Sequence, residues 1–181
     1  VYRAMENVDF VIHAAALKHV DAGEYNPFEF INTNVLGSQN IIDCCIEREV
    51  NHCIAISSDK AVNPTGVYGA TKLLMEKIFL AASNIKGSHK TKFACIRLGN
   101  LFNSSGSVVQ KFKVQDKLQV TDLKATRFTM TLKHATLKII DILELEQTGL
   151  IIPKLKAYIL RDLVEAFNKP YNVIGLRPGE K

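Results

Sequence analysis

The stretch C-I-A-I-S-S-D-K at residues 53–60, followed by V-Y-G-A-T-K at residues 67–72, decides the fold. Its first four residues form a short, bounded and partly β-branched apolar run, which is typical of a buried strand. The N-P-T-G segment at residues 63–66 has strong turn chemistry, so a loop follows the strand. A helix is predicted next. It carries Tyr68 and Lys72 on one face, because residues four apart on a helix are neighbours.

Five polar groups are expected to converge at the end of this strand. Ser58, Asp59 and Lys60 supply a hydroxyl, a carboxylate and an ammonium, and the helix supplies the phenol of Tyr68 and the ammonium of Lys72. The carboxyl edge of a parallel sheet is where α/β proteins place their ligands. This edge is therefore the candidate site.

The residue types predict proton transfer coupled to hydride transfer. A free tyrosine has a pKa of about 10, and a nearby lysine cation is expected to lower that value. A phenol tuned in this way can take a proton from an alcohol while hydride leaves the same carbon. Asp59 and Lys60 then remain as a second acid/base pair, which indicates more than a simple oxidation. A Tyr-x-x-x-Lys spacing alone is weak, and the strand–loop–helix context gives it weight.

Elements alternate along the first part of the chain, which argues for parallel β-α-β units. Strands are predicted at residues 8–14, 53–57 and 92–97, and helices at residues 27–49 and 67–83. After Asn100 the rhythm changes to a mixture of short elements. Helices are predicted there at 108–115, 133–146 and 158–167, and strands at 129–131, 150–152 and 172–174. We expect a first domain over residues 1–105 and a second, interwoven lobe over residues 106–181.

Composition excludes several classes of protein. Hydrophobic residues make up 47% and charged residues 23%, as in an ordinary globular domain. No apolar stretch approaches the roughly 20 residues of a membrane helix. The net charge of +5 comes from scattered lysines without interleaved aromatic residues, so nucleic-acid binding is not expected. The four cysteines have no metal or redox spacing, so we expect reduced thiols in the cytoplasm and no metal site.

The motifs resemble those of a known family. I-S-S-D-K-A-V-N-P and V-Y-G-A-T-K are similar to the extended short-chain dehydrogenase/reductases, above all to the inverting UDP-N-acetylglucosamine 4,6-dehydratases of the polysaccharide biosynthesis protein family. Further motifs in the family's order cover nearly the whole chain: H-A-A-A-L-K-H-V from His13, N-T-N-V-L-G from Asn32, R-L-G-N from Arg97, G-S-V-V from Gly106 and R-P-G-E-K from Arg177. The resemblance implies a Rossmann-like parallel sheet with helices on both faces, joined to part of a small mixed α+β substrate lobe.

The resemblance also implies a role for each catalytic residue. Tyr68 would take the proton of the sugar C4 hydroxyl as hydride passes to NADP, with NAD as the alternative cofactor. Lys72 would hold the phenolate and the nicotinamide ribose. Lys60 would remove the C5 proton, and Asp59 would protonate the leaving C6 hydroxyl. Ser58 would bind the sugar or orient the tyrosine.

Other positions carry binding roles by the same resemblance. The cofactor would meet residues at the strand ends, namely Ala14, Ala15, Ser57 and Leu98 besides the tyrosine and lysine. The UDP-sugar would meet Lys18, Asn100, Val108, Arg177 and Glu180. His13 is expected to be packed or hydrogen-bonded rather than catalytic. Asn34, in mid-helix, is predicted to be either a buried polar anchor or exposed.

Differences from the family pattern qualify this interpretation. No Gly-rich turn for a cofactor pyrophosphate occurs in residues 1–181, so we expect a fragment that lacks the first β-α units and has little activity alone. Ser105 and Gln110 replace an arginine and a proline, the segment 111–121 is short, and Lys133-His134 stands where an acidic pair is common. The leading hypothesis is an NADP-dependent nucleotide-sugar 4,6-dehydratase, a lyase that forms dimers or hexamers. The alternatives are a UDP-sugar epimerase and a non-catalytic nucleotide-binding domain.

Overall fold

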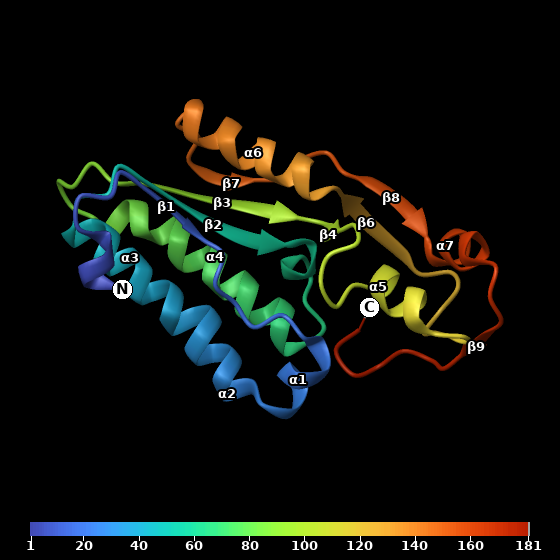
Figure 1. Cartoon of the computed structure of the whole chain (residues 1–181). Helices are drawn as coiled ribbons and strands as arrows, with labels where there is room; N and C mark the ends of the chain where they lie inside the picture. The colour runs from blue at the N-terminus through green and yellow to red at the C-terminus, as the bar shows by residue number, and fades with distance from the viewer. Residues whose placement is uncertain (181) are drawn as a thin grey trace.

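A computed structural model describes residues 1–180, which are built around a parallel sheet (Figure 1). Its four strands lie in the order β1-β2-β3-β7 and all run parallel. Their bounds are Phe10–His13, His52–Ser58, Lys92–Leu98 and Gly149–Ile151. The carboxyl ends of β1, β2 and β3 therefore meet at one edge, as the alternation of elements predicts.

Strand β2 lies inside the sheet, between β1 and β3, and it is apolar on both faces. Cys53 and Ala55 belong to a core beneath helices on one face, while Ile54 and Ile56 belong to a core on the other. A strand that is covered on both faces has a continuous apolar sequence, and such strands are typical of parallel sheets.

Helices cover both faces of this sheet. Figure 1 shows α3 (Gly37–Glu47) and α4 (Val67–Ile85) on one face, and α6 (Leu132–Glu144) on the other. The chain enters α3 through α2 (Pro27–Phe30) and a π-helical segment (Ile31–Leu36), so a helix was rightly predicted at residues 27–49 although its winding changes on the way. The short elements η1 (Tyr2–Met5), α1 (Val20–Tyr25) and η3 (Asp59–Ala61) complete this region.

A smaller region lies beyond the carboxyl edge, to the right in Figure 1. One sheet has the order β4-β6-β8, and a second pairs β5 with β9. The strands of these two sheets are Asn100–Leu101, Thr126–Met130, Lys156–Ile159, Leu118–Val120 and Tyr171–Val173. Helices α5 (Val108–Val114) and α7 (Leu160–Phe167) supply Phe112 and Val164 to its core. We call this set of elements the small lobe.

The fold class predicted from the sequence is confirmed, and its errors lie mainly in the small lobe. The helix predicted at residues 158–167 is wrong at its start, because Tyr158 and Ile159 belong to β8 and pair with Arg127 and Thr126. The predicted strand 8–14 is shorter and begins at Phe10. Strand β5 was missed because three residues carry no periodic signal. The domain boundary at residue 105 stays a prediction. Strand β4 precedes it but pairs with β6 of the small lobe, and β7 follows it but pairs with β3 of the parallel sheet.

Candidate functional site

A turn at the end of β2 brings three of the predicted catalytic residues together. Ser58 caps the helical turn η3, and its hydroxyl accepts a hydrogen bond from the backbone N–H of Lys60 at 3.3 Å. The Ser58 hydroxyl also donates to Asp59 Oδ1 at 3.0 Å. Lys60 Nζ donates to the same Asp59 oxygen at 3.1 Å. Because the turn is so tight, hydroxyl, carboxylate and ammonium form one hydrogen-bonded group.

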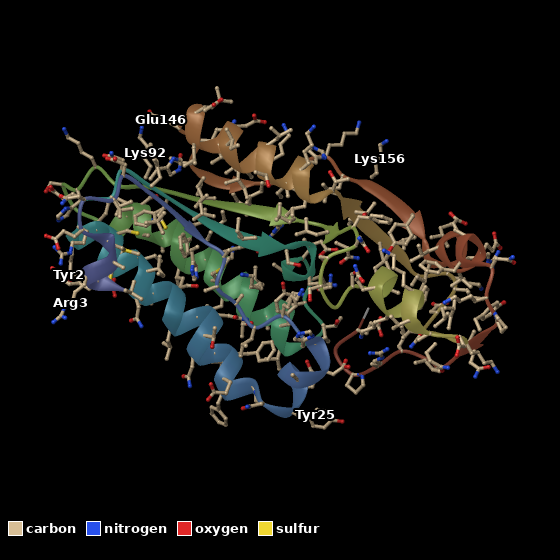
Figure 2. The ribbon with its side chains drawn as sticks, viewed as in Figure 1. Tyr2, Arg3, Tyr25, Lys92, Glu146 and Lys156 are labelled. Atoms are coloured by element: carbon tan, nitrogen blue, oxygen red, sulfur yellow. The ribbon has the colours of Figure 1, made fainter. Side chains whose placement is uncertain are left out.

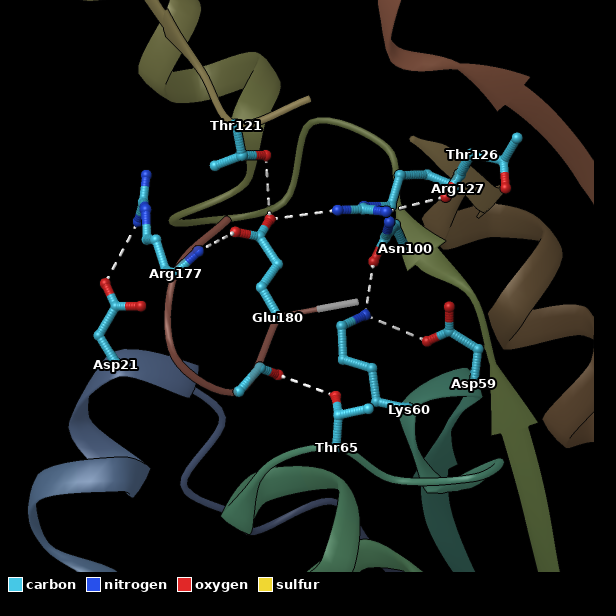
Figure 3. Close-up of polar contacts among 11 residues, drawn as sticks. Asp21, Asp59, Lys60, Thr65, Asn100, Thr121, Thr126, Arg127, Arg177 and Glu180 are labelled. Atoms are coloured by element: carbon cyan, nitrogen blue, oxygen red, sulfur yellow. Dashed lines mark hydrogen bonds and ion pairs between the residues drawn. The ribbon is translucent and has the colours of Figure 1, made fainter. Parts of the chain in front are cut away.

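Lys60 also contacts the first residue of β4. Its Nζ donates to Asn100 Oδ1 at 3.1 Å, so the ammonium lies between Asp59 and Asn100 (Figure 3). The side chains of Lys60 and Asp59 keep 33% and 21% exposure, so a ligand can reach both. The family resemblance assigned Asn100 to the UDP-sugar, and its contact with Lys60 was not foreseen.

Helix α4 approaches this turn closely because residue 69 is glycine. A Cβ at Gly69 would lie only 2.4 Å from the carbonyl oxygen of Lys60 and 2.9 Å from Pro64. The helix begins after Gly66, which has no side chain to cap it, and Glu24 takes over that function. Glu24 Oε1 accepts from the backbone N–H of Val67 at 2.7 Å, where a carboxylate complements the helix dipole.

The phenol of Tyr68 lies beside Ser58, but its electrostatics differ from the prediction. Burial raises the pKa of Tyr68 above its ordinary value, while the hydrogen bond with Ser58 acts in the opposite direction. The negative charge of Asp59 raises this pKa as well. The pKa of the phenol is thus raised rather than lowered in this structure, because burial and the charge of Asp59 act in the same direction, and the role of Lys72 toward the phenol stays a prediction.

Lys72 is nearly buried one turn further along α4, with 4% exposure. Its Nζ donates to Met75 Sδ at 3.3 Å. Burial lowers the pKa of Lys72 to about 8, and electrostatic interactions with Cys95 and Glu76 act against that shift. Because the pKa of Lys72 is near neutral pH, a change in the charges around it changes the fraction of the side chain that is protonated.

Buried polar residues behind the site fasten its elements together. Asn34 is 1% exposed and joins the loop after β1 to α4, because its Nδ2 donates to the Leu17 carbonyl and to Thr71 Oγ1, each at 3.0 Å. Its Oδ1 accepts from the Leu17 N–H at 2.8 Å. Of the two alternatives left open for Asn34, the buried anchor is the one observed.

His13 is packed and hydrogen-bonded, as expected. The Ser38 hydroxyl donates to the Asn34 carbonyl, so it accepts from His13 Nε2 at 2.8 Å, and the proton of the neutral ring lies on Nε2. The ring stacks on Phe79, and burial together with the charge of Lys72 lowers its pKa to about 4.

The predicted cofactor residues lie in different surroundings. Ala14 and Ala15 are exposed directly after β1. The Ser57 hydroxyl instead donates to Glu76 Oε1 at 2.5 Å beneath the site, and Leu98 is part of the core next to α6. The cofactor contacts of all four stay predictions.

Residues predicted for the substrate hold the C-terminal loop and the small lobe in place. Lys18 Nζ donates to the Ser105 carbonyl at 2.9 Å, and Arg177 pairs with Asp21 at 3.2 Å. Glu180 Oε1 accepts from Arg127 at 3.1 Å and from Thr121 at 3.3 Å (Figure 3). Val108 packs against the core of the small lobe at the start of α5. Their roles toward a ligand stay predictions.

Comparison with known proteins identifies the family. The profile of the family described as "Polysaccharide biosynthesis protein" matches residues 1–181. The chain belongs to the polysaccharide biosynthesis protein family. It is 46% identical over 186 residues to the UDP-N-acetylglucosamine 4,6-dehydratase (inverting) of Campylobacter jejuni, covering 98% of this chain and 56% of that protein. The resemblance stated from the motifs is thus confirmed.

Two further proteins widen the comparison. The UDP-glucose 4-epimerase of Rickettsia canadensis is 37% identical over 193 residues, covering 100% of this chain and 56% of that protein. The X-ray structure of Pen from Bacillus thuringiensis is 42% identical with a TM-score of 0.95, covering 99% of this chain and 60% of that one. The chain therefore spans little more than half the length of the relatives it matches.

Several site residues of this family member escaped the sequence reasoning. Glu24, Glu76, Arg97 and Arg127 all make buried or partly buried polar contacts at or beneath the edge. The spacing of Glu76, four residues after Lys72, was a usable signal. Within residues 1–180, no group of side chains suits a metal ion, and no helix has both the length and the apolar character to cross a bilayer.

Proposed function

We propose that the protein containing this chain is a C5-inverting UDP-N-acetylglucosamine 4,6-dehydratase, a lyase that works with a nicotinamide cofactor. The observation that carries the proposal is the 3.1 Å contact between Lys60 Nζ and Asp59 Oδ1, one residue from the Ser58 hydroxyl that meets Tyr68. Reversible oxidation of an alcohol needs one acid/base group, whereas loss of water needs a base and an acid as well. Tyr68 with Lys72 would serve the oxidation, and Asp59 with Lys60 would serve the loss of water.

The residues present fit a nicotinamide cofactor at the ends of β1 and β2. Ala14 and Ala15 are small and exposed there, so a ligand can approach the backbone. Lys72 has three N–H donors, of which the bond to Met75 Sδ uses one, so others are free to bind ribose hydroxyls. When bound, the nicotinamide supplies a reversible acceptor of hydride. We propose NADP rather than NAD on the family resemblance.

The first step assigned to the chain is removal of the C4 hydroxyl proton by Tyr68 as hydride leaves C4. Burial raises the pKa of the phenol, so this transfer needs a positive charge that stabilises the phenolate. Lys72, one turn away on α4, supplies that charge, and with a pKa of about 8 it is mostly protonated at neutral pH. The sugar then carries a ketone at C4.

The second step removes water across C5 and C6. The C4 ketone acidifies the C5 proton, which Lys60 takes when it is neutral, and Asp59 protonates the leaving C6 hydroxyl when it is a carboxylic acid. Passage of one proton along the Lys60–Asp59 hydrogen bond produces both forms at once. Return of hydride to C6 and delivery of a solvent-derived proton to the opposite face of C5 give the inverted 4-keto-6-deoxy sugar, while Tyr68 releases the proton it took to solvent and Lys60 keeps the C5 proton, which restores its ammonium.

The wider setting follows the same proposal. We expect a UDP-sugar as the substrate, assembly of identical chains and a cytoplasmic location. Four free cysteines, three of them fully buried, suit a reducing compartment.

The product of the complete gene tests the function. We expect conversion of UDP-N-acetylglucosamine, followed by NMR in D₂O, to a 4-keto-6-deoxy sugar with inverted C5 and deuterium at C5. Tyr68→Phe should stop all chemistry, and Lys60→Ala should stop deuterium entry at C5. Lys77→Ala, which removes an exposed ammonium from the same helix, is the matched control and should keep the activity. A C4 or C5 epimer without loss of water would move the assignment to the epimerases. No turnover would refute it.

A further inference from the structure

Glu76 is a buried carboxylate that the proposed reaction does not use. It lies on α4 with 1% exposure, one turn beyond Lys72 and two turns beyond Tyr68. The three side chains therefore follow one face of the helix at a spacing of four residues. Burying a carboxylate is costly unless it is paired and hydrogen-bonded, so its partners show what it does.

The partners of Glu76 come from two neighbouring strands. Arg97 of β3 binds it with two bonds, from Nε to Oε1 at 2.8 Å and from Nη2 to Oε2 at 2.6 Å. Ser57 of β2 donates to Oε1 at 2.5 Å. Ser57 and Arg97 are partners in the parallel register of β2 and β3. One carboxylate on α4 thus clamps a matched pair of residues at the ends of two strands.

The clamp is one residue away from the reacting groups. Ser57 precedes Ser58, whose hydroxyl contacts Tyr68 and bonds Asp59. A shift of β2 against α4 would therefore change the distance between the phenol and the Asp59–Lys60 pair. The neighbouring turn has little freedom to compensate, because helix and turn approach so closely that even a Cβ at Gly69 would lie 2.4 Å from the Lys60 carbonyl oxygen.

The charge of Glu76 also acts on Lys72, which lies one turn earlier on α4. The ionisable groups that act electrostatically with Lys72 are Glu76 on α4, Cys95 on β3 and His13 on β1. Of these, Glu76 is the group that carries a negative charge at neutral pH, since burial raises the pKa of Cys95 to about 12 and keeps the His13 ring neutral.

We propose that Glu76 is a positioning residue of the oxidation site: its carboxylate fixes the ends of β2 and β3 against α4 and supplies the negative charge opposite the ammonium of Lys72. This inference rests on the proposed function for its catalytic consequence. Its physical content, the coupling between Glu76 and Lys72, is independent of any turnover.

The first test measures the titration of Lys72 itself. The protein from the complete gene is labelled with ¹³C-lysine, the Lys72 side-chain carbon signal is assigned by its loss in Lys72→Arg, and its shift is followed against pH without cofactor. In Glu76→Gln the midpoint should move below the wild-type value, because a neutral amide no longer favours the cation. Superimposable titration curves for the two proteins would overturn the inference, whether or not the protein turns over substrate.

Two further variants separate charge from folding. Glu76→Gln leaves the partly buried Arg97 without its counter-ion, so the double variant Glu76→Gln/Arg97→Gln removes both charges and protects the fold. The inference predicts a lowered Lys72 midpoint in the double variant also, while a merely structural role predicts the wild-type midpoint. Glu146→Gln is the matched control, because Glu146 pairs with Lys92 at the opposite edge of the sheet (Figure 2). Its Lys72 titration should not change.

Activity then links the coupling to the proposed function. The alkaline limb of kcat/KM against pH should move to lower pH in Glu76→Gln, with a fall of about tenfold at alkaline pH that shrinks as the pH is lowered. Absence of turnover in the wild-type protein would refute the proposed function, and the NMR titration would still decide the coupling. A uniform fall at every pH with an unmoved Lys72 titration would reject the inference while leaving the dehydratase assignment intact.

Discussion

The carboxyl edge of the parallel sheet and the small lobe are built on different principles. At the edge, β2 and β3 are buried almost throughout, and polar groups such as Asn34 and Glu76 are enclosed and paired. In the small lobe, β8 and β9 are mostly exposed, and charged side chains at the surface do much of the joining. We therefore expect substitutions at the edge to have large effects and substitutions in the small lobe to have small ones.

Lys169 illustrates how the small lobe is held. Its Nζ donates to the carbonyls of Phe112, Lys113 and Gln115 at 3.0, 3.1 and 2.7 Å, at the end of α5. A cation at the C-terminus of a helix satisfies carbonyls that lack helical partners. One of these bonds is exposed and the other two are partly buried, so each contributes less than a bond in the enclosed edge.

The largest expected contrast comes from removing one phenolic oxygen in each region. Tyr68→Phe should lower kcat/KM for UDP-N-acetylglucosamine by about 10³-fold, because it removes the proposed acid/base group. Tyr158→Phe makes the same change in β8 and should keep turnover near the wild-type value. Steady-state kinetics of the complete gene product, with thermal melts to verify folding, measure both. Equal losses would remove the distinction between the regions.

A pH-dependent loss of stability should come next in size, and His13 at the edge should contribute to it. The folded pKa of His13, about 4, is below its ordinary 6.5, so protonation favours the unfolded chain. The contribution is complete above pH 6.5 and is lost as the pH falls toward 4, amounting to about 3 kcal/mol. His13→Gln, whose amide can still donate to Ser38, should flatten the fall in chemical denaturation. His89→Gln, on a side chain 40% exposed, should leave the fall unchanged.

Removing a buried anchor should cost more than removing an exposed amide. Asn34→Ala leaves the Leu17 backbone groups and Thr71 without their partner, and we expect a loss of about 2 kcal/mol in the free energy of unfolding. Asn172→Ala removes the same amide from the exposed strand β9 and should change stability little. Urea titrations of the two variants compare them, and a reversed order would contradict the contrast.

The smallest effect is expected within the small lobe. Lys169→Met keeps the apolar stem but loses the three carbonyl bonds, for a loss of about 1 kcal/mol. Hydrogen exchange should become faster at the end of α5 and stay unchanged in β2. Lys154→Met, at an exposed position, is the control. A change spread over the parallel sheet would show that the lobe is less independent than its contacts indicate.

The sequence predicted the edge well because its signals are local. The apolar run before Ser58, the turn chemistry and the Tyr68–Lys72 spacing lie within twenty residues and give strand, loop and helix in order. Contacts between distant residues left no such pattern, so Glu24 over the start of α4 and Asn100 beside Lys60 were missed. The raised pKa of Tyr68 was missed for another reason, since desolvation depends on the whole surrounding structure.

The cap of α4 bears on when the site can form during synthesis. Glu24 and Val67 are 43 residues apart, and Thr65 bonds the Gly179 carbonyl across 114 residues. A Cβ at Gly66 would be 2.6 Å from the Glu24 carboxylate and 2.7 Å from Gly179, so all three segments close on one point. Contacts between residues so far apart in the chain form late, and domains fold as the ribosome releases them. The helix that carries Tyr68 thus emerges long before Gly179, and the contacts of Gly179 with the start of that helix form only after the R-P-G-E loop has left the ribosome.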